Sequence, residues 1–131
     1  MHVVAARVLL RPADMDAAIA FYEQAVGLVR FREWGEPPNR GVVYFLGGGY
    51  LELGETPAGD PRPERPRGVR LWLQVPDIGA ARAELARADV AIGAEPERKP
   101  WGLLEMSVLD PDGVELVIIE IPLDHPLRRR S

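Results

Sequence analysis

The chain has 131 residues, of which 47% are hydrophobic and 27% are charged, and its formal net charge is −4 at pH 7. This balance fits one compact globular domain and excludes a disordered chain, and no apolar run is long enough to cross a bilayer, so we expect no membrane partner. The acidic charge argues against nucleic acid as a partner, and the absence of cysteine excludes disulfides and thiolate metal sites. Because the N-terminus lacks the pattern of a secretion signal, we expect a cytoplasmic protein.

The first predicted element is a strand that carries arginines on one face. The segment RVLLR, which reads as a buried strand, places Arg7, Leu9 and Arg11 at alternate positions. Two guanidinium groups and one apolar side chain therefore share a side of the strand. Asp14 then offers an N-cap, and apolar residues recur at helical spacing over 15–26, which predicts an amphipathic helix.

Three more strands are predicted after this helix. They cover residues 29–34, 41–46 and 50–55, and the glycines at 47–49 supply a hairpin turn between the last two. The next segment, 56–67, is rich in proline, glycine and charge, a composition that excludes regular structure. We therefore expect it to be a surface linker that divides the chain nearly in half.

The second half of the chain repeats the first. RVLLRPADMDAAIAFYEQA is echoed by RLWLQVPDIGAARAELARA, with a displacement of 63 from Arg7 to Arg70 (70 − 7) and from Asp14 to Asp77 (77 − 14). Three predicted strands follow the second helix, at residues 91–98, 103–109 and 114–121. Each half therefore has the order strand, helix and three strands, and neither half buries both faces of its sheet alone.

Several motifs of this chain occur together, and in the same order, in one known superfamily. They are D-x6-FY-x4-G from Asp14 to Gly27, LEL at 51–53, PWG at 100–102 and DPDGVELVIIE at 110–120. In this combination the chain resembles the vicinal oxygen chelate superfamily, which includes glyoxalases, bleomycin resistance proteins and dioxygenases. The resemblance extends over nearly the whole chain.

The resemblance implies an α+β fold in which paired βαβββ modules form an incomplete barrel around a cavity, usually in a dimer. We therefore expect residues 1–131 to form a single domain. Its two modules would span about 3–55 and 68–122, joined by the proline-rich linker 56–67. We also expect a homodimer, with cavities near the subunit interface.

Metal-using members of this superfamily hold their ion with four ligands. Carried onto this chain, the resemblance places the four positions at Arg7, Glu52, Arg70 and Val117. Arginine stays protonated and valine has no donor atom, so we predict no metal and no cofactor. One alternative stays open, because Glu115 lies on the same side of its strand as Val117, and a small register shift would bring it beside Glu52 to share a hard cation.

The two arginines at metal positions have two interpretations. If they face a common cavity, Arg7 and Arg70 pair with Glu52, and this network either only joins the two halves or leaves donors for a bound molecule. Trp72 shares a face with Arg70, and aromatic side chains beside cations suit a planar, partly polar ligand. The candidate ligand-binding residues are Arg7, Leu9, Trp34, Tyr50, Glu52, Arg70, Trp72, Trp101, Glu115 and Val117. Each aromatic among them has a structural interpretation as well, in the core or in a dimer contact.

The predicted function is that of a metal-free binding protein that sequesters a small aromatic molecule, such as a natural product or antibiotic, in the manner of resistance-type members. No nucleophile with a paired base is visible, so we assign no catalytic residue and favour a binding protein over an enzyme. The alternatives are a metal-dependent enzyme of the glyoxalase or dioxygenase type, a metal-free lyase or isomerase, and an accessory protein with a vestigial cavity.

Overall fold

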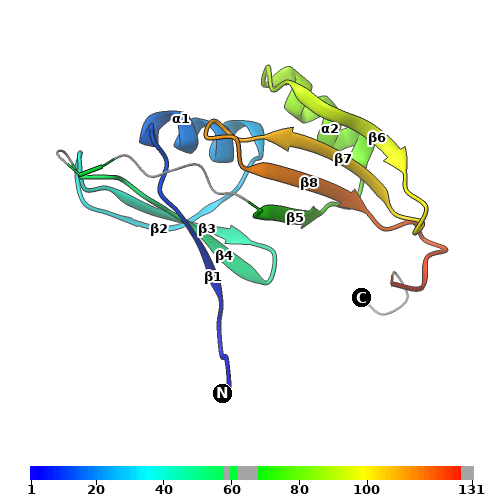
Figure 1. Ribbon diagram of the computed structural model, residues 1–131, viewed down its shortest axis with the longest axis horizontal. Coiled ribbons are helices and arrows are strands. Elements are labelled where there is room, and N and C mark those ends of the chain that lie inside the picture. The colour runs from blue at the N-terminus through cyan, green and yellow to red at the C-terminus, as the bar shows by residue number, and fades with distance from the viewer. Residues whose placement is uncertain (58–59, 62–67, 128–131) are drawn as a thin grey trace. The chain divides into compact units, whose positions relative to one another are not determined.

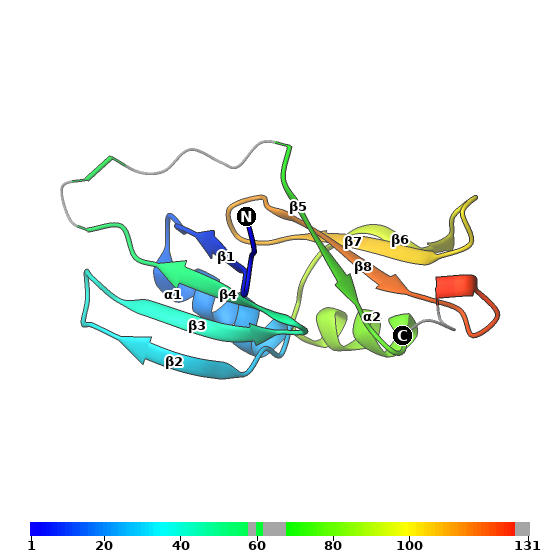
Figure 2. The same ribbon diagram turned by 90° about the horizontal axis from the view of Figure 1, so that it is seen from below.

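A computed structural model describes residues 1–57, 60–61 and 68–127. The chain forms two compact units whose boundary falls inside the segment 62–67, and each unit is described by itself (Figures 1 and 2). The predicted linker, 56–67, falls largely outside the described residues. That the two modules form a single domain, and that they enclose a barrel, therefore stay predictions.

The first unit consists of a four-stranded sheet and a helical segment. Its strands are β1 (Arg7–Leu10), β2 (Arg30–Trp34), β3 (Gly41–Leu46) and β4 (Gly49–Gly54), and its helix α1 (Met15–Ala20) continues into the π-helical turn η1 (Phe21–Ala25). The strand order in the sheet is β1-β4-β3-β2. Strand β1 runs parallel to β4, whereas the other neighbours are antiparallel, which confirms the predicted βαβββ order.

Helix α1 begins at its predicted cap and ends in a wider turn than the sequence predicts. The Asp14 carboxylate accepts a hydrogen bond of 3.0 Å from the Ala17 N–H, as an N-cap does. In the last turn, the Val26 N–H donates to the Phe21 carbonyl, a π-helical bond that adds a residue to the turn. The buried face therefore differs from a strict 3.6-residue stripe, and it is made of Met15, Ala18, Phe21, Tyr22 and Ala25.

The core of the first unit lies between α1 and one face of the sheet (Figure 2). The sheet contributes the fully buried side chains of Tyr44, Leu51 and Leu53. In the described part of this unit only α1 and η1 cover the sheet. On the face away from them Val43 is fully buried, whereas Leu9 of β1 is 65% exposed. The expectation of a buried first strand is therefore wrong for the face that carries Leu9 and Arg7.

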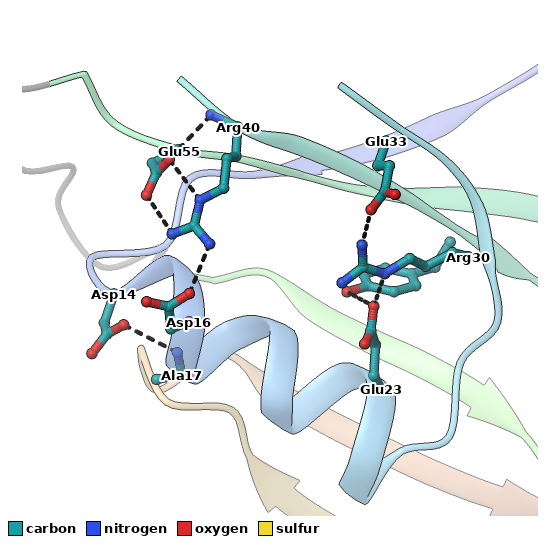
Figure 3. A network of polar contacts seen from close by, with 9 residues as sticks. Asp14, Asp16, Ala17, Glu23, Arg30, Glu33, Arg40 and Glu55 are labelled. Atoms are coloured by element: carbon teal, nitrogen blue, oxygen red, sulfur yellow. Dashed lines mark hydrogen bonds and ion pairs between the residues drawn. The ribbon is translucent and has the colours of Figure 1, made fainter. Parts of the chain in front are cut away.

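Two ion-pair clusters tie the helix of the first unit to its sheet (Figure 3). In one, Arg40 donates to Glu55 in a two-pronged contact at 3.0 and 2.7 Å, and to Asp16 of α1 at 2.7 Å. In the other, Arg30 of β2 bonds to Glu23 of η1, which also accepts a hydrogen bond of 3.0 Å from the buried Tyr44 hydroxyl. Burial raises the pKa of that hydroxyl, and its bond to Glu23 raises it further. Both clusters are structural, because they join elements of one unit.

The second unit repeats the architecture of the first. It contains β5 (Arg70–Gln74), α2 (Ile78–Arg87), β6 (Ile92–Arg98), β7 (Leu104–Leu109) and β8 (Glu115–Glu120). The strand order is β5-β8-β7-β6, with β5 parallel to β8. This order is that of the first unit, so the sequence repeat is also a structural repeat.

Helix α2 is fixed to its sheet at its N-terminus. The Asp77 carboxylate accepts from the Ala80 N–H at 3.0 Å, and the Glu120 carboxylate at the end of β8 accepts from the Ile78 N–H at 2.9 Å. The helix packs against β6, β7 and β8. A separate buried cluster, on the sheet face away from the helix, consists of Leu103, Val117, Ile119 and Ile121.

None of the described helices is long and apolar enough to span a membrane.

The turn between β7 and β8 is organised by one buried carboxylate. Asp110 is 7% exposed, and its Oδ1 accepts hydrogen bonds of 2.9 Å from the backbone N–H groups of Asp112 and Val114. Gly113 supplies the positive φ of 85° that this turn needs. The carboxylate thus satisfies two N–H groups that lie outside the strand ladder.

Removal of the Asp110 carboxylate is expected to destabilise the protein. Asp110→Ala leaves two backbone N–H groups without their acceptor, which costs about 1–3 kcal/mol in the free energy of unfolding. Asp110→Asn keeps one side-chain oxygen as acceptor and should lose less. Urea unfolding followed by circular dichroism measures both, and equal losses in the two variants would contradict this account.

The Arg40–Glu55 contact predicts a pH-dependent contribution to stability. The hydrogen bonds from Arg40 hold the pKa of Glu55 below its ordinary value of 4.5. A carboxyl group with a lowered folded-state pKa stabilises the protein above its unfolded pKa, and this contribution is lost as the pH falls through the folded-state pKa. We therefore expect Glu55→Gln to destabilise the protein at pH 7, and expect the difference from the unsubstituted protein to shrink as the pH falls below 4.5.

The measurement is urea unfolding of both proteins at pH 7 and at pH 3. Glu84→Gln, which removes an exposed carboxylate from α2, is the matched control and should follow the unsubstituted protein at both pH values. A difference between Glu55→Gln and the unsubstituted protein that stays constant with pH would refute the assigned role of the carboxylate.

Candidate functional site

In the first unit, four of the predicted site residues share the sheet face away from α1. Arg7 lies opposite Tyr50, and Leu9 opposite Glu52, in the parallel register of β1 and β4. The Arg7 Nη1 donates to the Glu52 Oε1 at 2.8 Å, and the guanidinium carbon lies 5.5 Å from the centroid of the Tyr50 ring. Arg7 is therefore held both by a charge-assisted hydrogen bond and by a cation–π contact.

Two phenylalanines that sequence analysis missed extend this face. The rings of Phe31, Phe45 and Tyr50 contact one another, with centroid separations of 5.1, 5.2 and 6.0 Å. Phe31 is 46% exposed and Phe45 is 45% exposed, so the cluster presents ring surface to its surroundings. We call the set of Phe31, Phe45, Tyr50, Arg7 and Glu52 the aromatic face.

The sequence carries a signal for only one of the two phenylalanines. Phe45 pairs with Tyr50 across the β3–β4 hairpin, so counting outward from the Gly47 turn finds it. Phe31 lies at a register shift in β2, between Arg30 and Arg32, where simple alternation fails. Its place on the face depends on that irregularity, which the sequence pattern does not reveal.

Trp34, another predicted site residue, packs its indole ring over the neighbouring strand β3 of its own sheet. It pairs with Gly41, and a Cβ atom at Gly41 would lie 2.1 Å from the Trp34 ring. The Arg32 guanidinium carbon is 5.3 Å from the centroid of the same ring. The indole therefore occupies the space that glycine leaves open, and at 39% exposure it keeps part of its surface free.

A methyl group at Gly41 is expected to displace the Trp34 ring. Gly41 is buried and the built Cβ collides with the indole, so Gly41→Ala should lower the free energy of unfolding by about 1–3 kcal/mol and change the tryptophan emission spectrum. Gly48→Ala is the matched control, because a Cβ there meets nothing within 4 Å. If both variants keep the emission spectrum and stability of the unsubstituted protein, the indole does not rest on Gly41.

In the second unit, four predicted site residues line a pocket of about 260 Å³. These are Arg70, Trp101, Glu115 and Val117. Glu105, Ser107 and Lys99 also line it. Its floor is the sheet face away from α2, since Arg70 pairs with Glu115 and Val117 with Ser107 across neighbouring strands. Trp72 lies opposite Val117 on the same face and is 53% exposed, but it is outside the pocket lining.

The charged groups of this pocket are partnered to different degrees. Arg70 Nη1 lies 3.8 Å from Glu115 Oε1, an ion pair longer than a hydrogen bond. The Trp101 indole N–H donates to the Glu105 carboxylate, and both residues line the pocket. Lys99 donates to Glu97 at 2.9 Å, and this bond raises the pKa of the Lys99 ammonium. Arg70 is the pocket cation with the longest contact to its partner.

The comparisons with known proteins agree with this architecture. Residues 2–118 match the model of the Glyoxalase/Bleomycin resistance protein/Dioxygenase superfamily. The chain belongs to this superfamily. The match extends over both units, which confirms the resemblance drawn from the motifs.

Solved structures of the superfamily fold are similar to this chain over nearly its full length. The structure of SMU.1112c has 28% sequence identity and a TM-score of 0.75, covering 92% of this chain and 99% of that one. A glyoxalase-related enzyme from Fulvimarina pelagi has 22% identity and a TM-score of 0.73, covering 94% and 91%. TnmS3, an antibiotic binding protein from Streptomyces sp. CB03234, has 24% identity and a TM-score of 0.68, covering 92% and 100%. A search of the curated proteins found no match.

The superfamily's metal positions can be tested against the strand register. Leu9 lies opposite Glu52 and Trp72 lies opposite Val117, so Glu52 and Val117 hold equivalent positions in the two sheets. Of the residues at the four carried-over positions, only Glu52 has a lone pair to give a metal, and its Oε1 already accepts from an arginine. Within the described part of the chain, no three His, Asp or Glu side chains gather as a metal site would require. The donor set therefore does not fit the superfamily's ion.

Glu115 was the alternative donor, and its approach to Glu52 of the other unit stays a prediction. It lies opposite Arg70, two residues before the position equivalent to Glu52. Its carboxylate is thus the partner of an arginine. A cation at Glu115 would have to displace, or lie beside, that guanidinium, which electrostatics oppose.

Proposed function

We propose that this protein binds a small aromatic molecule and releases it unchanged, as a metal-free member of its superfamily. The aromatic face carries the proposal, because it presents three contacting rings beside the Arg7–Glu52 ion pair, and these two residues stand at positions where the resemblance implies metal ligands. Flat apolar rings with a few fixed polar groups suit a planar organic compound. The similarity to TnmS3, an antibiotic binding protein, also supports a binding function.

The ligand class we propose is an aromatic natural product or antibiotic, held by sequestration rather than by reaction. Arg7 and Glu52 bind each other at 2.8 Å, so the carboxylate is engaged as an ion-pair partner rather than poised as a lone base. The proposed binding residues are the predicted set together with Phe31 and Phe45. We further propose a cytoplasmic homodimer with its cavities near the subunit interface.

The direct test is equilibrium dialysis of the protein against a panel of polycyclic aromatic antibiotics, with mass spectrometry of the recovered compounds. Retention of a compound with unchanged mass supports sequestration. Recovery of a modified product overturns it in favour of an enzyme, and Glu52→Gln then decides whether Glu52 is the base. Retention of none of the compounds would favour a vestigial cavity.

Truncation of one ring of the aromatic face is expected to weaken ligand binding. Phe45→Ala removes a half-exposed ring that contacts Phe31 and Tyr50, so the dissociation constant of a retained compound should rise about three- to tenfold. The control is Leu123→Ala, which removes an exposed apolar side chain outside the sheets. Dialysis or fluorescence titration measures both, and equal effects of the two substitutions would exclude the aromatic face as the contact surface.

A further inference from the structure

The two repeats place an arginine at equivalent positions, but the two guanidinium groups have different surroundings. Arg7 lies opposite Tyr50, and Arg70 lies opposite Glu115, in the matching parallel strand pairs. Arg7 therefore lies beside the Tyr50 ring, and it donates to Glu52, which is two residues further along β4 on the same face. The position equivalent to Glu52 in the second repeat is an apolar residue, so Arg70 lacks that partner.

Among the residues that the structure describes, the ion-pair partner of Arg70 is Glu115, and the contact between them is long. Its ion pair with Glu115 spans 3.8 Å, compared with 2.8 Å for Arg7 and Glu52. The Arg70 side chain is 66% exposed, against 36% for Arg7. A guanidinium group carries five N–H donors, and a contact of 3.8 Å is too long to use one of them as a hydrogen bond. Arg70 thus keeps donors for an incoming acceptor.

The pocket around Arg70 combines this cation with an aromatic wall. Trp101 lines the pocket, and its indole N–H is bound by the Glu105 carboxylate. That bond fixes the indole by its polar edge and satisfies part of the carboxylate. Val117 and Met106 add apolar surface to the lining. A volume of about 260 Å³ accommodates a compound of one or two rings.

We propose that the second unit's pocket binds an aromatic carboxylate, with the carboxylate on the Arg70 guanidinium and the ring against Trp101. A planar carboxylate matches the two-pronged donor geometry of arginine, which the long contact to Glu115 leaves unused. Arg70 is then the residue that selects an anion. This inference rests on the proposed function, because it specifies the chemistry of the compound that the protein would bind.

The test uses two probes of the same shape, 2-naphthoate and its neutral amide, 2-naphthamide. Each is titrated at pH 7 into ¹⁵N-labelled protein, and the three tryptophan indole N–H resonances, assigned by substitution, report the site. We expect the Trp101 resonance to shift with both probes, and the naphthoate to bind at least about tenfold more tightly than the amide.

Three variants separate the anion contact from a structural role of Arg70. Arg70→Met should remove the preference for naphthoate, because it weakens naphthoate binding about tenfold and amide binding much less. Glu115→Gln removes the carboxylate that competes for Arg70, so it should strengthen naphthoate binding several-fold. Arg87→Met, which removes an exposed arginine at the end of α2, is the matched control and should keep the preference. The backbone amide spectra of the variants verify that each is folded.

The outcomes distinguish this inference from the proposed function. Equal affinity for the two probes, or a preference that survives Arg70→Met, overturns the assignment of Arg70 while aromatic binding stands. Weaker naphthoate binding in Glu115→Gln overturns it as well, because the carboxylate would then help to hold the ligand. If neither probe shifts the Trp101 resonance, the pocket is not an aromatic site and the inference fails. If neither probe shifts the backbone amide resonances of the aromatic face either, the proposed function loses its support.

Discussion

In the described residues each four-stranded sheet packs against one helical segment, which covers one of its two faces, and the candidate site residues lie on the other face. Burial against α1 or α2 stabilises one face of each sheet, and the apolar positions of the strands follow that demand. The opposite faces carry the arginines, carboxylates and half-exposed rings. The opposite faces are packed only in part, since the second unit has a buried apolar cluster there and Val43 is fully buried in the first, and polar side chains occupy the remainder. The candidate binding residues thus lie on the faces away from the helices, where Val117 belongs both to a buried cluster and to the pocket lining.

The repeat gives the two units one architecture and two different surfaces. In the first unit, Arg7 is bound by Glu52 and lies over Tyr50, so the cation is part of a fixed assembly with aromatic neighbours. In the second unit, the equivalent Arg70 has a long contact to Glu115 and a pocket beside it. A shared backbone register with changed side chains therefore produces one face of rings and one charged pocket.

Much of the fold could be predicted because its signals are local. The caps Asp14 and Asp77, the strand patterns and the displacement of 63 between the halves specify each βαβββ unit without long-range information. The pairing of Arg7 with Glu52 could also be predicted, because the resemblance places both residues at metal-ligand positions of the family. The contribution of Phe31 could not be predicted, because a register shift in β2 changes the sheet face on which its side chain lies.

Other features of the site depend on tertiary contacts that cannot be predicted from a sequence pattern. Trp34 was predicted at the site, yet its position over Gly41 follows from the absence of a side chain on the neighbouring strand. The π-helical turn after α1 likewise moves the buried stripe away from the 3.6-residue spacing, so Phe21 and Tyr22 are both buried. A stripe of uniform period does not anticipate such a turn.

The parallel pairing of the first strand with the last in each unit also orders events during synthesis. Strand β1 finds its partner only when β4 has been made, so the leading strand of each unit waits for the trailing one. A nascent chain that ends after β3 has a helix and a hairpin but no partner for β1, and the arginine on that strand has no carboxylate to bind. The same holds for β5 and β8 in the second unit. The binding face of each unit is therefore completed last, when the final strand of the unit pairs with its first strand.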